Sequence, residues 1–248
     1  MEFNALDSYS IKARYYPTLI VVTPICLVIL SLASKQFDLL KDLGVVVASG
    51  LGLIFVMDQV GRDGGRNKQP ELFRRWGGVP TTVLLRHRDK TIDAITKARY
   101  HRILSESLHN LDVPSEHQEN ENPSQADDVY ASCTEFLKET TRDHSKFPLV
   151  FQENTNYGFR RNLWGMRPAG IILSIVGTVV CGVLVFFRLL ESAGDLLIPF
   201  SSTILSAVLL SFWICRFTAS WVRMAAYVYA RQLLAACDSL QKAREARE

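Results

Sequence analysis

Four apolar stretches dominate the hydrophobic pattern of the 248-residue chain. Uncharged, mostly apolar residues run over 15–34, 43–57, 168–187 and 196–215. Three of these stretches are 20 residues long, about the length of helix that crosses a hydrocarbon core of ~30 Å. The second has only 15 residues, so its length alone also fits a buried helix in a soluble core. Because eight residues separate it from the first, we expect the two to form a helical hairpin. The sequence therefore predicts an all-α polytopic membrane protein with four transmembrane helices.

Lys and Arg are distributed unevenly about these spans. If both chain ends lie in the cytoplasm, the two outer loops hold only Lys35, Lys41 and Arg188, and the other 25 of the 28 basic residues lie inside. Basic residues near span ends are kept on the cytoplasmic side of a membrane. We therefore expect a bacterial inner-membrane protein, embedded in the lipid bilayer, with its N- and C-termini in the cytoplasm.

The soluble stretch between the second and third spans predicts an inserted cytoplasmic domain. Charge divides it, because residues 59–104 carry 11 Lys and Arg against 4 Asp and Glu, whereas residues 105–145 carry 2 against 10. Ser115–Asp128 has no large apolar residue, so we interpret residues 112–128 as an acidic flexible linker, a loop or disordered segment. The predicted organisation is a first transmembrane hairpin over 1–58, a helical domain over 59–167, a second hairpin over 168–215 and a C-terminal helix over 216–248.

Local patterns predict the elements of this domain. Pro70 and the pair Gly77-Gly78 bracket a short helix over 69–76. Apolar residues recur at helical spacing over 91–108 and over 129–142, which predicts two amphipathic helices. Residues 81–85 have strand-like content or form an extended connector. The apolar pattern after residue 215 indicates that the fourth span continues as a longer helix.

Small and hydroxyl-bearing residues mark the faces through which the spans meet. Stripes of small residues on spans two and three fit close packing within one monomer, or a face toward a neighbouring subunit or a central pore. Span four has a row of hydroxyls that fits a wet path, so Ser202 and Ser206 are predicted to line a pore. Asp58 and Arg216 lie at the cytoplasmic ends of spans two and four, where they fit a gate or, alternatively, solvated helix ends.

The chain lacks the motifs of common catalytic and metal sites. No glycine-rich loop ends in Lys-Ser/Thr, no serine or cysteine stands in a nucleophile motif, and no carboxylate near His101 and His109 completes a metal site. Five cysteines without paired spacing fit buried thiols better than disulfides or a zinc site. We therefore expect a protein that is not an enzyme and that uses neither a cofactor nor a metal.

Arginines interleaved with aromatic residues form the clearest candidate binding site. Guanidinium groups pair with phosphates and stack on rings, so this combination is typical of nucleotide or nucleic-acid ligands. The same residues also fit contact with anionic lipid, or internal pairing with the acidic segment. The candidate ligand-binding residues are Arg62, Arg66, Arg74, Arg75, Trp76, Arg86, Arg88, Arg99, Tyr157, Arg160 and Arg161.

Two of these stretches, Leu72–Gly78 and Tyr157–Arg161, together with the layout of the whole chain, carry a family resemblance. The chain resembles small bacterial membrane effectors of anti-phage defence, in particular the Hailong-type channel effector. This resemblance implies an oligomeric ion channel gated by an oligonucleotide signal. We expect a homo-oligomer, with a tetramer favoured, because a pore made of four-span subunits needs several copies. The rival hypothesis is a non-conducting membrane anchor or scaffold whose inserted domain recruits a protein partner.

Overall fold

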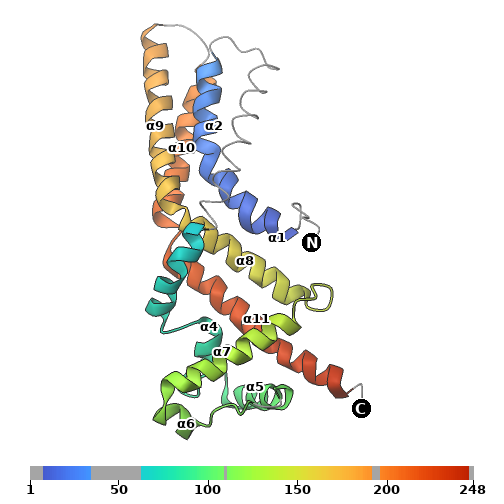
Figure 1. Ribbon diagram of the computed structural model, residues 1–248. Coiled ribbons are helices and arrows are strands. Elements are labelled where there is room, and N and C mark those ends of the chain that lie inside the picture. Colours follow the sequence, from blue (N-terminus) through green and yellow to red (C-terminus); the bar gives the residue numbers. More distant parts are fainter. Residues whose placement is uncertain (1–7, 35–62, 109–110, 192–195, 246–248) are drawn as a thin grey trace. The chain divides into compact units, whose positions relative to one another are not determined.

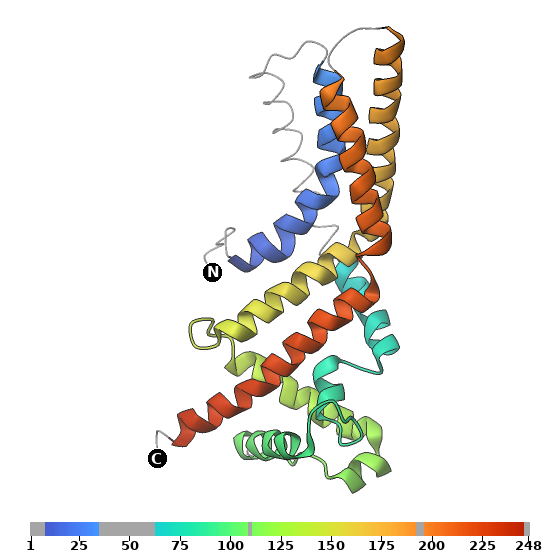
Figure 2. The same ribbon diagram turned by 180° about the vertical axis from the view of Figure 1, so that it is seen from behind.

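The computed structural model describes residues 8–34, 63–108, 111–191 and 196–245. Every regular element in these ranges is a helix, so the predicted all-α fold is confirmed for the described part of the chain. The chain divides into two compact units (Figures 1 and 2). Unit 1 comprises Met1–Gln69 and Gly158–Val222, and unit 2 comprises Pro70–Tyr157 and Arg223–Glu248.

Unit 1 contains three helices that are long and apolar enough to cross a membrane. The first begins with α1 (Ser8–Ser10) and a π-helical turn (Ile11–Tyr15) and continues as α2 (Tyr16–Ala33); the others are α9 (Arg167–Leu190) and α10 (Leu197–Cys215). Three of the four apolar stretches are therefore confirmed as helices of membrane-spanning length. The predicted second span over 43–57 lies outside the described residues.

Small residues let these three helices pack closely on one another (Figure 1). A Cβ atom at Gly170 of α9 would lie 2.2 Å from the Trp213 ring of α10. A Cβ atom at Gly177 would lie 2.9 Å from both Pro24 Cβ of α2 and Ser206 Oγ of α10. The stripe of small residues on span three therefore packs the helices of one chain, which was the first of the two interpretations. The stripe on span two lies outside the described residues.

Arginines at the two ends of α9 hydrogen-bond to the C-terminal ends of both neighbouring spans. Arg167 donates to two carbonyl oxygens at the end of α10, 2.9 and 3.0 Å away. Arg188 Nη2 donates to the carbonyl oxygen of Ser31 (2.8 Å) and to Ser34 Oγ (3.0 Å) at the end of α2. A helix C-terminus carries partial negative charge, so each cation stabilises the end that it meets. Arg188 is not the loop residue that the sequence predicted, because it lies in α9 with 2% exposure; its place on the outer side of the membrane stays a prediction.

Unit 2 is built from short helices around a separate apolar core. Large buried side chains such as Leu84, Leu104, Tyr130 and Leu234 come from four different helices and pack into this core. The elements of unit 2 are helical residues 70–76, α4 (Pro80–Leu85), α5 (Ala94–Ser107), α6 (Glu116–Glu121), α7 (Pro123–Thr140), the first part of α8 (Pro148–Gly165) and most of α11 (Ala219–Glu245).

Side-chain caps fix where three of these helices begin. Asp93 accepts a hydrogen bond from the Thr96 backbone N–H (2.8 Å) and begins α5. Ser115 and Gln118 form a reciprocal capping box at the start of α6. Asn122 caps α7, which opens with a proline at its first position. The two predicted amphipathic helices are thereby confirmed as α5 and α7, with α7 beginning earlier than its apolar pattern indicated.

Two predictions for unit 2 are wrong in their local structure. Residues 81–85 are neither a strand nor a connector but belong to α4, because Pro80 starts the helix and Leu84 and Leu85 are buried in the core. Ser115–Asp128 is not a loop or disordered linker, since it forms α6 and the beginning of α7. The cap residues and the burial of Glu119 at 1% exposure hold this polar segment in helices.

Two helix boundaries also differ from the prediction. The predicted helix over 69–76 is longer, because residues 63–76 are all helical and Pro70 lies inside the stretch. The fourth span does not continue into the C-terminal helix, since α10 ends at Cys215 and α11 begins at Ala219. Thr218 accepts a hydrogen bond from the Trp221 backbone N–H (3.3 Å), which caps α11 as a separate helix. All five cysteines are free. Cys133, Cys181 and Cys237 are buried, as the sequence indicated, whereas Cys26 is half-buried and Cys215 is exposed.

Candidate functional site

The break between α10 and α11 brings two arginines to one tryptophan within unit 1. Arg216 is the first residue after α10, and Trp221 lies in the first turn of α11. The guanidinium carbon of Arg216 lies 5.2 Å from the centre of the Trp221 ring, and that of Arg160, on α8, lies 4.9 Å from it. We call Arg160, Arg216 and Trp221 the arginine–tryptophan cluster.

Aromatic packing holds Trp221 in place. Phe159 meets its ring edge to face at a centroid distance of 6.2 Å, and Phe217 packs on it at 5.3 Å. Trp221 is 9% exposed, whereas Arg216 is exposed. Arg160 also donates a hydrogen bond to the Trp221 carbonyl oxygen (3.1 Å). The cluster therefore presents positive charge on a fixed aromatic platform, an arrangement suited to a phosphate or another anion.

The basic and acidic residues of the whole chain are divided unequally between the two units. Unit 1 contains 12 Lys and Arg against 8 Asp and Glu, and unit 2 contains 16 against 17. The positive net charge of the chain therefore belongs to unit 1. The structure describes no carboxylate within ion-pair distance of Arg216.

Several other basic residues of unit 1, among them Arg161 and Lys68, have polar partners of their own. Arg161 donates to Asn162 Oδ1 and to Gln69 Oε1 at 3.2–3.3 Å. Lys68 donates to the Gly165 carbonyl oxygen (3.2 Å), and Arg66 is exposed on the helix over 63–76. The candidates Arg62 and Asp58 lie outside the described residues.

Three predicted ligand-binding arginines of unit 2 instead form ion pairs with acidic residues. Arg86 binds both carboxylate oxygens of Asp127, at 2.8 and 2.7 Å. Arg99 binds both oxygens of Asp238, at 2.9 and 3.2 Å. Arg88 Nε lies 3.9 Å from Glu119. These pairs follow the internal-pairing alternative that the sequence left open, and they reduce the positive charge available to a ligand in unit 2.

The remaining predicted residues of unit 2 do not gather into one site. Arg74 and Arg75 are exposed, and Arg75 pairs with Glu71 one helical turn away. Trp76 is 9% exposed, and Tyr157 is 7% exposed where it stacks on Tyr229. The role of these residues in ligand binding stays a prediction.

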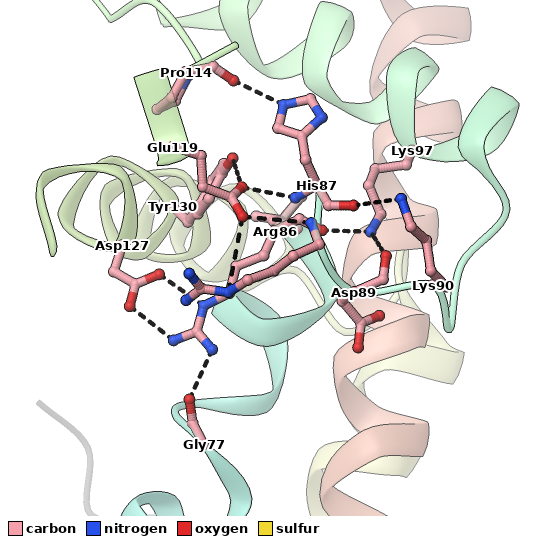
Figure 3. A network of polar contacts seen from close by, with 12 residues as sticks. Gly77, Arg86, His87, Asp89, Lys90, Lys97, Pro114, Glu119, Asp127 and Tyr130 are labelled. Carbon is pink, nitrogen blue, oxygen red and sulfur yellow. Dashed lines mark hydrogen bonds and ion pairs between the residues drawn. The ribbon is translucent and has the colours of Figure 1, made fainter. Parts of the chain in front are cut away.

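A buried polar network fixes the segment between α4 and α5 (Figure 3). Glu119 accepts hydrogen bonds from the His87 backbone N–H (2.7 Å) and the Tyr130 hydroxyl (2.8 Å). Lys97 donates to the carbonyl oxygens of Arg86 and Asp89 after the end of α4. Burial opposes the charged form of Glu119, but the hydrogen bonds from His87, Tyr130 and Arg88 outweigh it and lower the pKa of its carboxyl group. The network therefore holds an ionised carboxylate inside the fold.

The histidine at the edge of this network is held neutral. His101 is 9% exposed, its Nε2 lies 2.8 Å from the Leu85 carbonyl oxygen, and its ring meets that of His87 at 4.8 Å. Burial lowers the pKa of His101 to about 4, from 6.5. Because a carbonyl oxygen accepts this bond, Nε2 carries the proton.

We expect the stability of unit 2 to fall as the pH drops from 6.5 toward 4. In this interval the unfolded chain protonates His101 while the folded chain does not, so stability present above pH 6.5 is lost, by at most about 3 kcal/mol. Hydrogen exchange of α5 and α7 in the full chain would measure the slope of the free energy of unfolding against pH. His101→Asn, which keeps a donor for Leu85, should flatten it, and His117→Gln at an exposed site should not. A slope that is the same in all three proteins would contradict the assignment.

The predicted pore and gate residues of span four occupy two different environments. Ser202 is 2% exposed and Ser206 is fully buried, where Ser206 faces α9 beside Gly177. Arg216 is exposed and belongs to the arginine–tryptophan cluster. Whether the serines line a permeation path stays a prediction.

Several residues at the centre of these clusters were not predicted from the sequence. Trp221 and Glu119 were not singled out, although Thr218 three residues before Trp221 and the Ser115–Gln118 capping box are visible as helix-start signals. Burial of Arg188 has no local sequence signal, since it depends on contact with Ser31 and Ser34, which lie 157 and 154 residues away. No protein family, curated protein or solved structure matches the chain.

Proposed function

We propose that the chain forms an oligomeric inner-membrane ion channel gated by an anionic ligand on its cytoplasmic side, a nucleotide or an oligonucleotide. The observation that carries the ligand site is the pair of guanidinium groups of Arg160 and Arg216 on the ring of Trp221. Phosphodiesters pair with guanidinium groups, and bases stack on aromatic rings. The proposed site is narrower than the sequence expectation, because Arg86, Arg88 and Arg99 are paired with carboxylates.

The position of Arg216 links such a site to a membrane span. Arg216 directly follows α10, and Arg160 lies on the part of α8 that belongs to unit 1. An anion that binds both guanidinium groups would restrain the end of α10 relative to α8. The ligand gates the channel if it binds one position of α10 more tightly than the other. A role in anti-phage defence is part of the same proposal.

A non-conducting membrane anchor is the second candidate function. It is favoured by the nearly balanced charge of unit 2 and by its separate apolar core, which suit a domain that recruits a protein. Unit 2 also exposes large apolar side chains, with Ile95 82% exposed and Met224 62% exposed. An anchor predicts a stable complex with a protein partner and no ion flux under any condition.

Removing either guanidinium group of the cluster should weaken the ligand response. In liposomes that contain the full chain, Arg216→Gln and Arg160→Gln should each raise the oligonucleotide concentration for half-maximal ion flux roughly tenfold, since a hydrogen bond to a charged group is lost. Arg142→Gln is the matched control, because Arg142 is an exposed arginine of unit 2 paired with Glu139. Equal responses in all three variants and the unaltered protein would remove the cluster from the ligand site.

A further inference from the structure

One face of α9 carries buried polar and small residues along almost its whole length. Gly170, Ser174, Gly177 and Cys181 follow one another at spacings of three and four residues, and Arg188 lies seven residues further on. All five are buried against the neighbouring spans. From Gly170 to Arg188 this face extends ~27 Å at 1.5 Å per residue, close to the ~30 Å thickness of a hydrocarbon core.

The neighbouring spans add further polar groups to this face. Trp213 of α10 lies against Gly170 at one end, and Ser206 of α10 meets Gly177 near the middle. Cys181 Sγ lies 3.6 Å from Ser31 Oγ of α2, whose carbonyl oxygen accepts from Arg188. We call this set the polar seam; it consists of Ser31, Ser34, Ser174, Arg188, Ser206 and Trp213.

Three polar atoms of the seam have no hydrogen-bond partner in the part of the chain that the structure describes. They are Ser174 Oγ, Ser206 Oγ and Trp213 Nε1, and all three side chains are fully buried. Serines in membrane helices usually donate back to a carbonyl of their own helix, as exposed Ser201 and Ser211 do here. A buried polar atom without a partner costs free energy. We therefore expect an ion or a ligand to enter the seam and bond to these groups in some state of the protein.

The chemistry of the seam favours an anion as that occupant. Trp213 and Arg188 can only donate hydrogen bonds, and serine hydroxyl groups can donate as well. The three described spans contain no Asp or Glu to accept a cation. A guanidinium group at one end also attracts anions and repels cations.

We propose that the polar seam is the permeation path and that it conducts small inorganic anions such as chloride. Each subunit of the oligomer then has its own path between its packed helices, in place of the shared central pore that the sequence predicts. This inference rests on the proposed channel function and names its permeant ion. The described conformation is closed, because the helices touch where Gly177 meets Ser206. Opening requires α9 and α10 to separate along the seam, after which its hydroxyl and indole donors replace water around the anion.

The test is the reversal potential and chloride conductance of the full chain in planar bilayers under a potassium chloride gradient, with oligonucleotide added. The potential should lie near that of chloride. Ser206→Ala and Ser174→Ala should each lower chloride conductance roughly tenfold, the effect of one lost hydrogen bond to a charge. Ser201→Ala and Ser211→Ala, which remove exposed hydroxyls already bonded to their own helix, should leave the conductance unchanged.

The outcomes separate this inference from the channel proposal. Ligand-dependent current with a reversal potential near that of potassium would overturn the anion path and leave the channel in place. Chloride current that is the same in the seam variants and the controls would overturn the seam as the path. No current in any protein would remove both proposals. Arg188→Lys, which keeps the charge, should retain chloride selectivity, whereas a folded Arg188→Gln variant should lose it.

Discussion

Replacing Glu119 with alanine is expected to lower the free energy of unfolding of unit 2 by about 3 kcal/mol. The change leaves the His87 backbone N–H and the Tyr130 hydroxyl without their acceptor, and both groups lie at a carboxylate that is 1% exposed. It also removes the acidic partner of Arg88. Hydrogen exchange of α6 and α7 in the detergent-solubilised full chain would measure the loss.

Glu116→Ala supplies the matched control for this change. Glu116 lies on the same helix, α6, with its side chain exposed, so its removal should change the free energy of unfolding by less than about 0.5 kcal/mol. The Glu119 contribution should also depend on pH. It is complete above the ordinary carboxyl pKa of 4.5 and is lost as the pH falls through the lower folded-state pKa of Glu119. Equal effects of the two substitutions would contradict a structural role for the buried network.

Replacing Gly170 with leucine is expected to prevent α9 and α10 from packing. Even the first added carbon would lie 2.2 Å from the Trp213 ring, far inside any normal contact distance, and Trp213 is fully buried. We expect the free energy of unfolding to fall by about 3 kcal/mol or more, the upper range for overpacking a tight core. Thermal unfolding in detergent, followed by tryptophan fluorescence, would measure the effect.

Gly182→Leu is the control for steric bulk on the same helix. A Cβ atom at Gly182 would meet nothing closer than Thr203 Cγ2 at 3.9 Å, an ordinary contact. This variant should insert and unfold like the unaltered protein. If Gly170→Leu were equally stable, the packing of α9 against α10 described above would be wrong.

The three helices of membrane-spanning length were predictable because their signal lies in composition and length alone. Long uncharged stretches identify α2, α9 and α10 without knowledge of their partners. Apolar periodicity predicted α5 and α7, because apolar residues at helical spacing form one buried face, and the structure confirms both helices. Where the local signal was polar or short, as in α4 and α6, prediction failed because caps and burial in the core determined the structure.

The candidate site was less predictable, because it depends on which charges meet. Sequence placed Arg86, Arg99 and Arg160 in one candidate site, but Asp127 and Asp238 lie 41 and 139 residues from their arginine partners. Such pairing has no local pattern. Arg188 was misassigned for the same reason, since its burial requires the end of α2. The prediction that arginines meet aromatic rings was closer, because Arg160 does lie on a tryptophan ring, although that residue, Trp221, was not among the candidates.

Ion flux from liposomes that contain the purified full chain measures whether a ligand gates a channel. Flux is compared without ligand and with short DNA or RNA oligonucleotides or cyclic nucleotides, at fixed salt because phosphate contacts are salt-dependent. We expect one of these ligands to change the flux and protein-free liposomes to show no such change. The same flux with and without every ligand would contradict ligand gating, and the absence of flux under all conditions would favour the membrane anchor.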